Sequence, residues 1–80
     1  MRLGSRQKEA VLVNRPGAKL TRRDGQWIAT WHDASQPVAL RWCAQVLSRV
    51  DRDMGVWWWP EAHARTREQA VAQVLIDAAS

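Results

Sequence analysis

Few residues of this chain could do catalytic chemistry: one cysteine, Cys43, and two histidines, His32 and His63. Their spacing matches neither a zinc-binding motif nor the pairing of a nucleophile with a base. Cys43 falls on an apolar stripe, which is typical of an inert core thiol. Asp51 and Asp53 are interpreted as solvated loop charges, because arginines flank them. We therefore expect no catalytic site, no metal and no cofactor, and a protein that is not an enzyme.

Basic side chains offer a second kind of chemistry, and they gather in the first third of the chain. Residues 1–23 carry a net charge of +6, whereas residues 24–80 carry −2. The basic residues of that first third are Arg2, Arg6, Lys8, Arg15, Lys19, Arg22 and Arg23. Such asymmetry predicts either nucleic acid or an acidic protein surface as partner. A solvated basic tail is the alternative.

Tryptophan is the only aromatic residue type, and Trp57, Trp58 and Trp59 are consecutive before Pro60. Neighbouring side chains of a strand point to opposite faces, so these three cannot all reach one core. Burying the larger pair favours Trp57 and Trp59 inside and Trp58 outside. The reverse arrangement, which would expose two tryptophans, stays open. Because tryptophan and arginine often carry interface energy, an exposed tryptophan predicts a binding surface.

A β-hairpin must position the basic residues. Asp24-Gly25 predicts a two-residue turn between strands 18–23 and 26–32, which pairs Arg23 with Gln26. The predicted core face holds Ala18, Leu20, Trp27, Ala29 and Trp31, with Arg22 at its rim over the Trp27 ring. The other face holds Lys19, Thr21, Arg23, Ile28, Thr30 and His32. We expect this second face to be the exposed, basic one.

The remaining pattern predicts two helices and two further strands. Residues 10–13 form a β-branched strand candidate, 36–50 carry a helical apolar stripe, and 56–59 form a strand. Thr66-Arg67-Glu68-Gln69 is a capping box that opens a helix to about residue 79. The order β-β-β-α-β-α predicts an α+β fold, an antiparallel meander with both helices packed on one face. Residues 1–8 are expected to be a flexible basic arm, and residues 9–80 a single domain.

The expected cellular compartment is inferred from the cysteine count and from the apolar segments of the sequence. A single cysteine fits a reducing environment, although a disulfide dimer through Cys43 stays open, as does the choice between monomer and homodimer. The first residues lack the apolar region of a signal peptide, and no apolar run is long enough to span a membrane. We expect a protein of the bacterial cytoplasm with no membrane partner.

Two stretches resemble the arm-type DNA-binding domain of phage integrases: TRRDGQWIATWHD, at residues 21–33, and ARTREQAVAQVLIDA, at residues 64–78. That family has a three-stranded sheet followed by a capped helix. The resemblance implies corresponding roles for Arg22, Arg23, Trp27 and Thr66, with the sheet face in a DNA major groove. It makes double-stranded DNA binding the alternative function.

In size and in its lack of motifs, the chain also resembles the small anti-CRISPR inhibitors of phages and mobile elements. That resemblance is one of type, and it implies a binder that blocks a surface of a host protein or ribonucleoprotein complex, such as a type I Cascade. The residues expected to carry binding are Arg15, Lys19, Arg22, Arg23 and Trp58, supported by Arg2 and Arg6.

Overall fold

The sheet begins with the predicted hairpin, strands β1 (Lys19–Arg23) and β2 (Gln26–His32). The computed structural model describes residues 17–51 and 55–79. Asp24 and Gly25 have φ angles of 52° and 76°, the left-handed values that a type I′ turn requires at both positions. Arg23 pairs with Gln26, and Leu20 pairs with Ala29. The hairpin and its register are confirmed.

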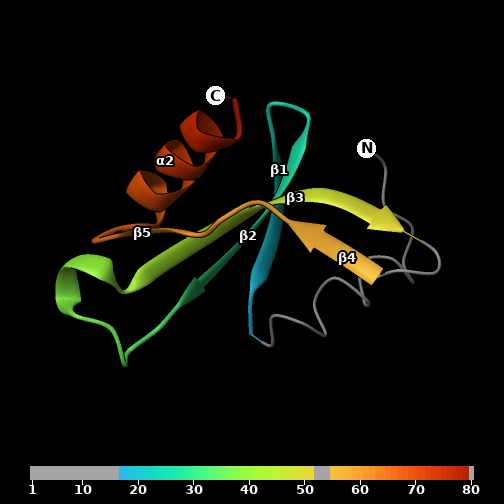
Figure 1. Cartoon of the computed structure of the whole chain (residues 1–80). Helices are drawn as coiled ribbons and strands as arrows, with labels where there is room; N and C mark the ends of the chain where they lie inside the picture. The colour runs from blue at the N-terminus through green and yellow to red at the C-terminus, as the bar shows by residue number, and fades with distance from the viewer. Residues whose placement is uncertain (1–16, 52–54, 80) are drawn as a thin grey trace.

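Strand β3 (Trp42–Asp51) lies at the centre of the sheet (Figure 1). It pairs with β2 along one side. Along its other side it pairs with two short strands, β4 (Gly55–Trp58) and β5 (Ala62–Ala64). Pro60 lies between β4 and β5, where a residue without a backbone N–H suits an interrupted outer strand. The result is an antiparallel sheet in the order β1-β2-β3-β4, with β5 beside β3.

The prediction of a helix over residues 36–50 is wrong. Only the short 3-10 helix η1 (Val38–Leu40) forms after Pro37, and residues 42–50 belong to β3. Buried residues at 43–47 lie on both faces of the strand, so the sequence lacks the alternation of a half-exposed strand. The same apolar residues also satisfy helical spacing, and pairing with strands on both sides decides between the two.

The C-terminal helix α2 (Arg67–Ala79) confirms the predicted capping signal. The Thr66 hydroxyl accepts a hydrogen bond from the backbone N–H of Gln69 at 3.2 Å, which satisfies one of the free donors of the first turn. Val71 and Val74 are buried, and Leu75 and Ala78 pack against the same core, as expected. The chain is of the α+β class, but in the described residues one α-helix covers the sheet instead of two.

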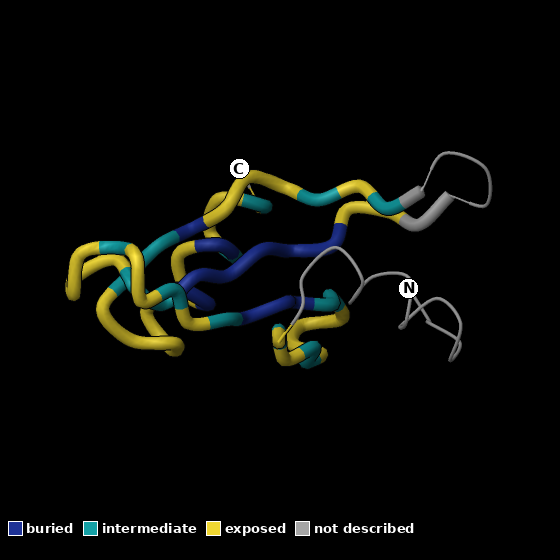
Figure 2. Tube along the Cα trace, turned by 90° about the horizontal axis from the view of Figure 1, so that it is seen from below, coloured by how far each residue is buried: buried dark blue, intermediate teal, exposed yellow. Residues whose placement is uncertain are grey.

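The face that α2 covers is the opposite of the predicted core face. Its core joins Ile28, Ala44, Val46 and Ala62 of the sheet to Ala70, Val71 and Val74 of α2. A smaller cluster lies on the other face around Leu47, with Leu20, Trp27, Val56 and Trp58 packed against it. Figure 2 shows how burial follows the middle of the sheet. The wrong face was predicted as exposed because β1 places three polar residues on the same face as Ile28. These are Lys19, Thr21 and Arg23.

The sheet is covered unevenly along its length. α2 packs on β3, β5 and β2, and Figure 1 shows it above β5, away from β4. The arm predicted at 1–8 and the strand predicted at 10–13 lie outside the described residues. In the described ranges, no helix has the length and apolar character needed to cross a membrane.

Candidate functional site: the tryptophans of β4 and a buried thiol cluster

The predicted binding residues do not form one surface. Arg2, Arg6 and Arg15 lie outside the described residues. Lys19 and Arg23 project from β1 toward the face that carries Ile28 and α2. Trp58 pairs with Leu47 and packs in the cluster on the opposite face. The structure therefore separates Trp58 from the two basic residues that were expected to accompany it.

Arg23 is engaged within the fold. Its guanidinium donates hydrogen bonds to both carboxylate oxygens of Glu68, at 3.0 and 3.5 Å, which links β1 to the first turn of α2. These contacts lower the pKa of Glu68 and raise that of Arg23, through the hydrogen bond first and the charge attraction second. The positive charge expected to meet a partner is thus compensated by α2. Arg22, by contrast, lies 5.7 Å above the Trp27 ring, as predicted.

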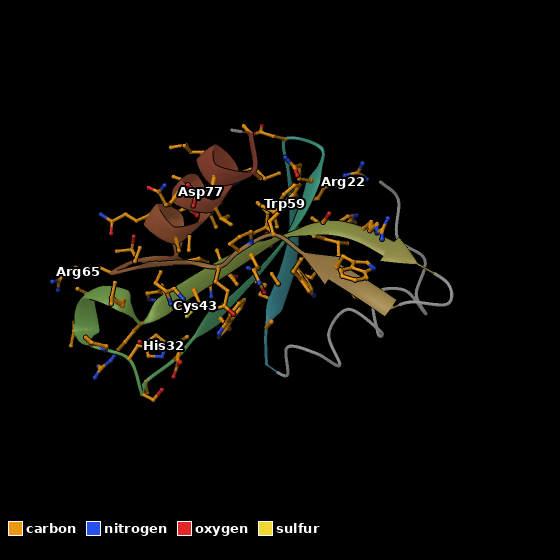
Figure 3. All side chains as sticks on the ribbon, viewed as in Figure 1. Arg22, His32, Cys43, Trp59, Arg65 and Asp77 are labelled. Carbon is orange, nitrogen blue, oxygen red and sulfur yellow. The ribbon has the colours of Figure 1, made fainter. Side chains whose placement is uncertain are left out.

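The exposed tryptophans are Trp57 and Trp59, not Trp58. They keep 44% and 45% of their surface accessible, whereas Trp58 is half-buried against Leu47. Strand alternation places Trp57 and Trp59 on the side opposite Trp58, and Figure 3 labels Trp59 just beyond β4. We expected the larger pair to be buried beneath helices, but α2 stops short of β4 and the second helix is a strand. The reverse arrangement, with two tryptophans outside, is the one observed.

Arg49 completes this surface. Its guanidinium lies 5.2 Å from the centre of the Trp57 ring, a cation–π contact between paired residues of β3 and β4. The register shifts between Leu47 and Arg49, which marks a β-bulge beside the two tryptophans. Within the described chain, β4 pairs with β3 alone. We call Arg49, Trp57 and Trp59 the tryptophan edge.

A second cluster surrounds the only cysteine. The Cys43 sulfur lies 3.3 Å from Nδ1 of His63, and Nε2 of the same ring lies 3.1 Å from a Glu61 carboxylate oxygen. Cys43 and His63 are direct partners in the pairing of β3 with β5. Burial raises the pKa of the Cys43 thiol, and the carboxylates of Glu61 and Asp33 raise it further.

This cluster was not predicted, because β5 was not predicted. Cys43 is buried, as predicted, but His63 meets it through strand pairing across twenty residues, and no motif spacing records that. The other histidine, His32, packs edge-on against Trp42 instead. No group of three or more histidine, cysteine or acidic residues within the described ranges is arranged to hold a metal ion.

Comparison with protein-family models, with curated proteins and with solved structures finds no match to this chain.

Proposed function

We propose that this protein is a small binding protein that acts by covering an acidic surface of a partner protein with its tryptophan edge. The observation that carries the proposal is the exposure of Trp57 and Trp59, at 44% and 45%, on an outer strand. The exposed part of each indole contributes nothing to the fold, whereas burial against a partner would remove that apolar surface from water.

The composition of the edge suits a protein partner. Tryptophan and arginine are the residue types that most often dominate interface energy. Arg49 adds a positive charge next to the indole of Trp57, so a partner with a carboxylate beside an apolar pocket would be complementary. Each indole N–H can also donate a hydrogen bond while the ring is buried. An acidic protein surface therefore fits better than an apolar one.

Duplex DNA is the less favoured partner. The centre of the face expected to meet DNA is buried, with Ile28 and Thr30 0% and 2% exposed, whereas Lys19 and His32 of the same face are exposed. Arg23, the central residue of that prediction, is paired with Glu68. The buried centre and the pairing of Arg23 make this face less suited to a DNA groove, and DNA binding becomes an outcome of the experiment below.

The most concrete form of the proposed function is inhibition of the anti-CRISPR type in the bacterial cytoplasm. The chain has 80 residues and a net charge of +4, which disfavours mimicry of DNA and favours obstruction of a protein surface. The partner would be the host's type I Cascade-like complex, at an acidic surface such as one that recruits a nuclease, because a surface that recruits DNA is basic and would not complement Arg49. No cofactor takes part in this action.

The experiment is a plaque assay in a host whose type I CRISPR system targets the infecting phage. Expression of the wild-type protein should restore plaques, and the double variant Trp57→Ala/Trp59→Ala should abolish the effect. Ile76→Ala is the matched control, because Ile76 is also apolar and 64% exposed but lies on α2.

A parallel measurement separates the DNA alternative. Anisotropy of labelled random duplex DNA should show negligible binding even at low salt. Tight, salt-sensitive DNA binding that survives loss of both tryptophans would contradict a protein target. Restored plaques with the double variant would contradict the tryptophan edge as the contact.

A further inference from the structure

The cluster of Cys43, His63 and Glu61 has the connectivity of a nucleophile, a base and an orienting acid. The sulfur faces one ring nitrogen at 3.3 Å, and the carboxylate faces the other at 3.1 Å. This connectivity places a base within reach of the thiol and holds that base with a third group. Because burial raises the pKa of the Cys43 thiol, the thiolate would form only as His63 removes the proton during attack. The proposed binding function uses none of these side chains.

The carboxylate determines which ring nitrogen carries the proton. An ionised carboxylate only accepts hydrogen bonds, so the Nε2 that faces Glu61 bears the hydrogen in the neutral ring. Nδ1 then presents its lone pair to the Cys43 sulfur and can accept the thiol proton. The Arg41 carbonyl oxygen, 3.7 Å from the sulfur, is a competing and weaker acceptor.

Strand pairing holds Cys43 and His63 in place, with Glu61 next to the paired segment. Cys43 and His63 are opposite residues of β3 and β5, and Glu61 directly precedes β5. A site built on paired strands keeps its geometry better than one built on loops. The site also has depth: Cys43 is 1% exposed, whereas the side chains of His63 and Glu61 keep 31% and 38% of their surface. Because the Cys43 sulfur is almost fully covered, only a small reagent can reach it.

We propose that Cys43 is a nucleophilic thiol that accepts a short acyl group from a small activated ester or thioester, with His63 as general base. The sulfur forms a bond to the carbonyl carbon as its proton passes to Nδ1 of His63. The bond to the leaving alcohol or thiol breaks, and the leaving group takes that proton. Hydrolysis would reverse the roles: His63 takes a proton from water, the carboxylic acid is released and the free thiol returns. Glu61 is a positioning residue that fixes the ring and stabilises the imidazolium.

The test uses the folded, full-length protein and 4-nitrophenyl acetate. We expect a burst of 4-nitrophenolate of one equivalent per protein, and an acetyl group located on Cys43 by mass spectrometry of its peptides. Cys43→Ala should remove both. Because a general base typically contributes about 10²–10⁴-fold, His63→Asn should slow acetylation of Cys43 at least about 100-fold. Circular dichroism verifies that each variant is folded.

His32→Asn is the matched control, because imidazoles react with this ester on their own and His32 contacts Trp42 instead of Cys43. It should acetylate at the wild-type rate. Glu61→Gln should slow the reaction and alter its pH profile, and Glu61→Asp should restore part of both. If His63→Asn does not fold, the two Glu61 variants still test the relay.

Three results would overturn the proposal: a folded wild-type protein whose Cys43 is never acetylated, acetylation at an equal rate without His63, or a pH profile that Glu61→Gln leaves unchanged.

Discussion

At the scale of single residues, the three consecutive tryptophans have two different tasks. Trp58 packs against Leu47 and so belongs to the fold, whereas Trp57 and Trp59 are exposed on the other side of β4. A strand can divide neighbouring side chains between stability and binding in this way because its faces alternate. Substitutions at these positions should therefore affect different properties.

Trp58→Ala should destabilise the protein by at least about 2 kcal/mol, since truncating a buried aromatic costs roughly 3–5 and Trp58 is partly exposed. Trp57→Ala should cost less, about 1 kcal/mol, because the ring is 44% exposed and contacts the Arg49 guanidinium through a cation–π pair. Urea unfolding followed by circular dichroism measures both. Equal losses for the two variants would contradict the division of tasks.

The ion pair between Arg23 and Glu68 should make the free energy of unfolding depend on pH in the acidic range. The folded-state pKa of Glu68 is lowered, so the pair's contribution is present above the unfolded-state pKa of about 4.3 and is lost as pH falls through the folded value. Arg23→Gln should raise the Glu68 pKa toward its ordinary range, with the attraction of Arg67 remaining, and flatten this part of the stability curve. NMR titration of the carboxyl carbon is the direct measurement. An unchanged Glu68 pKa in the variant would show that Arg23 is not the cause.

At the scale of elements, the β1–β2 turn depends on left-handed backbone at Gly25, with φ at 76°. A Cβ built there meets nothing within 4 Å, so Gly25→Ala should cost about 1 kcal/mol through backbone strain alone. Gly25→Asn should cost less, because asparagine tolerates this conformation. Thermal unfolding of the two variants compares them, and an equal loss would point to a cause other than φ.

The cap of α2 can be tested separately. Thr66→Ala removes the acceptor for the Gln69 N–H and should cost about 1 kcal/mol, whereas Thr66→Ser should keep most of it. Chemical denaturation measures both losses. A Thr66→Ala protein as stable as the wild type would mean that water replaces the cap without cost.

The elements that could be predicted are those set by a few adjacent residues, namely a turn and a helix cap. The hairpin follows from Asp24-Gly25 and α2 from Thr66 and Gln69, because turns and caps are decided by a few adjacent residues. β3 was mistaken for a helix because its residues are buried on both faces, which removes the alternation. β5 has three residues and depends on pairing with β3, so it carries no signal of its own.

At the scale of the whole molecule, both site errors follow from those two strands. A helix over residues 36–50 would have covered Trp57 and Trp59, and its loss leaves them outside while Trp58 packs inward. Because β5 was not predicted, the position of His63 beside Cys43 was not predicted either. The prediction of the α+β class is confirmed, because that class requires only a sheet and a helix that covers it.

The central claim is that the tryptophan edge binds a protein partner. The most direct measurement is the affinity of the purified protein for a purified type I Cascade complex, by biolayer interferometry, with the wild type, Trp57→Ala/Trp59→Ala and Ile76→Ala. We predict that the double variant binds at least about 30-fold more weakly, the equivalent of about 2 kcal/mol, while Ile76→Ala is unaffected. Wild-type affinity in a folded double variant, or no binding by the wild type itself, would contradict the claim.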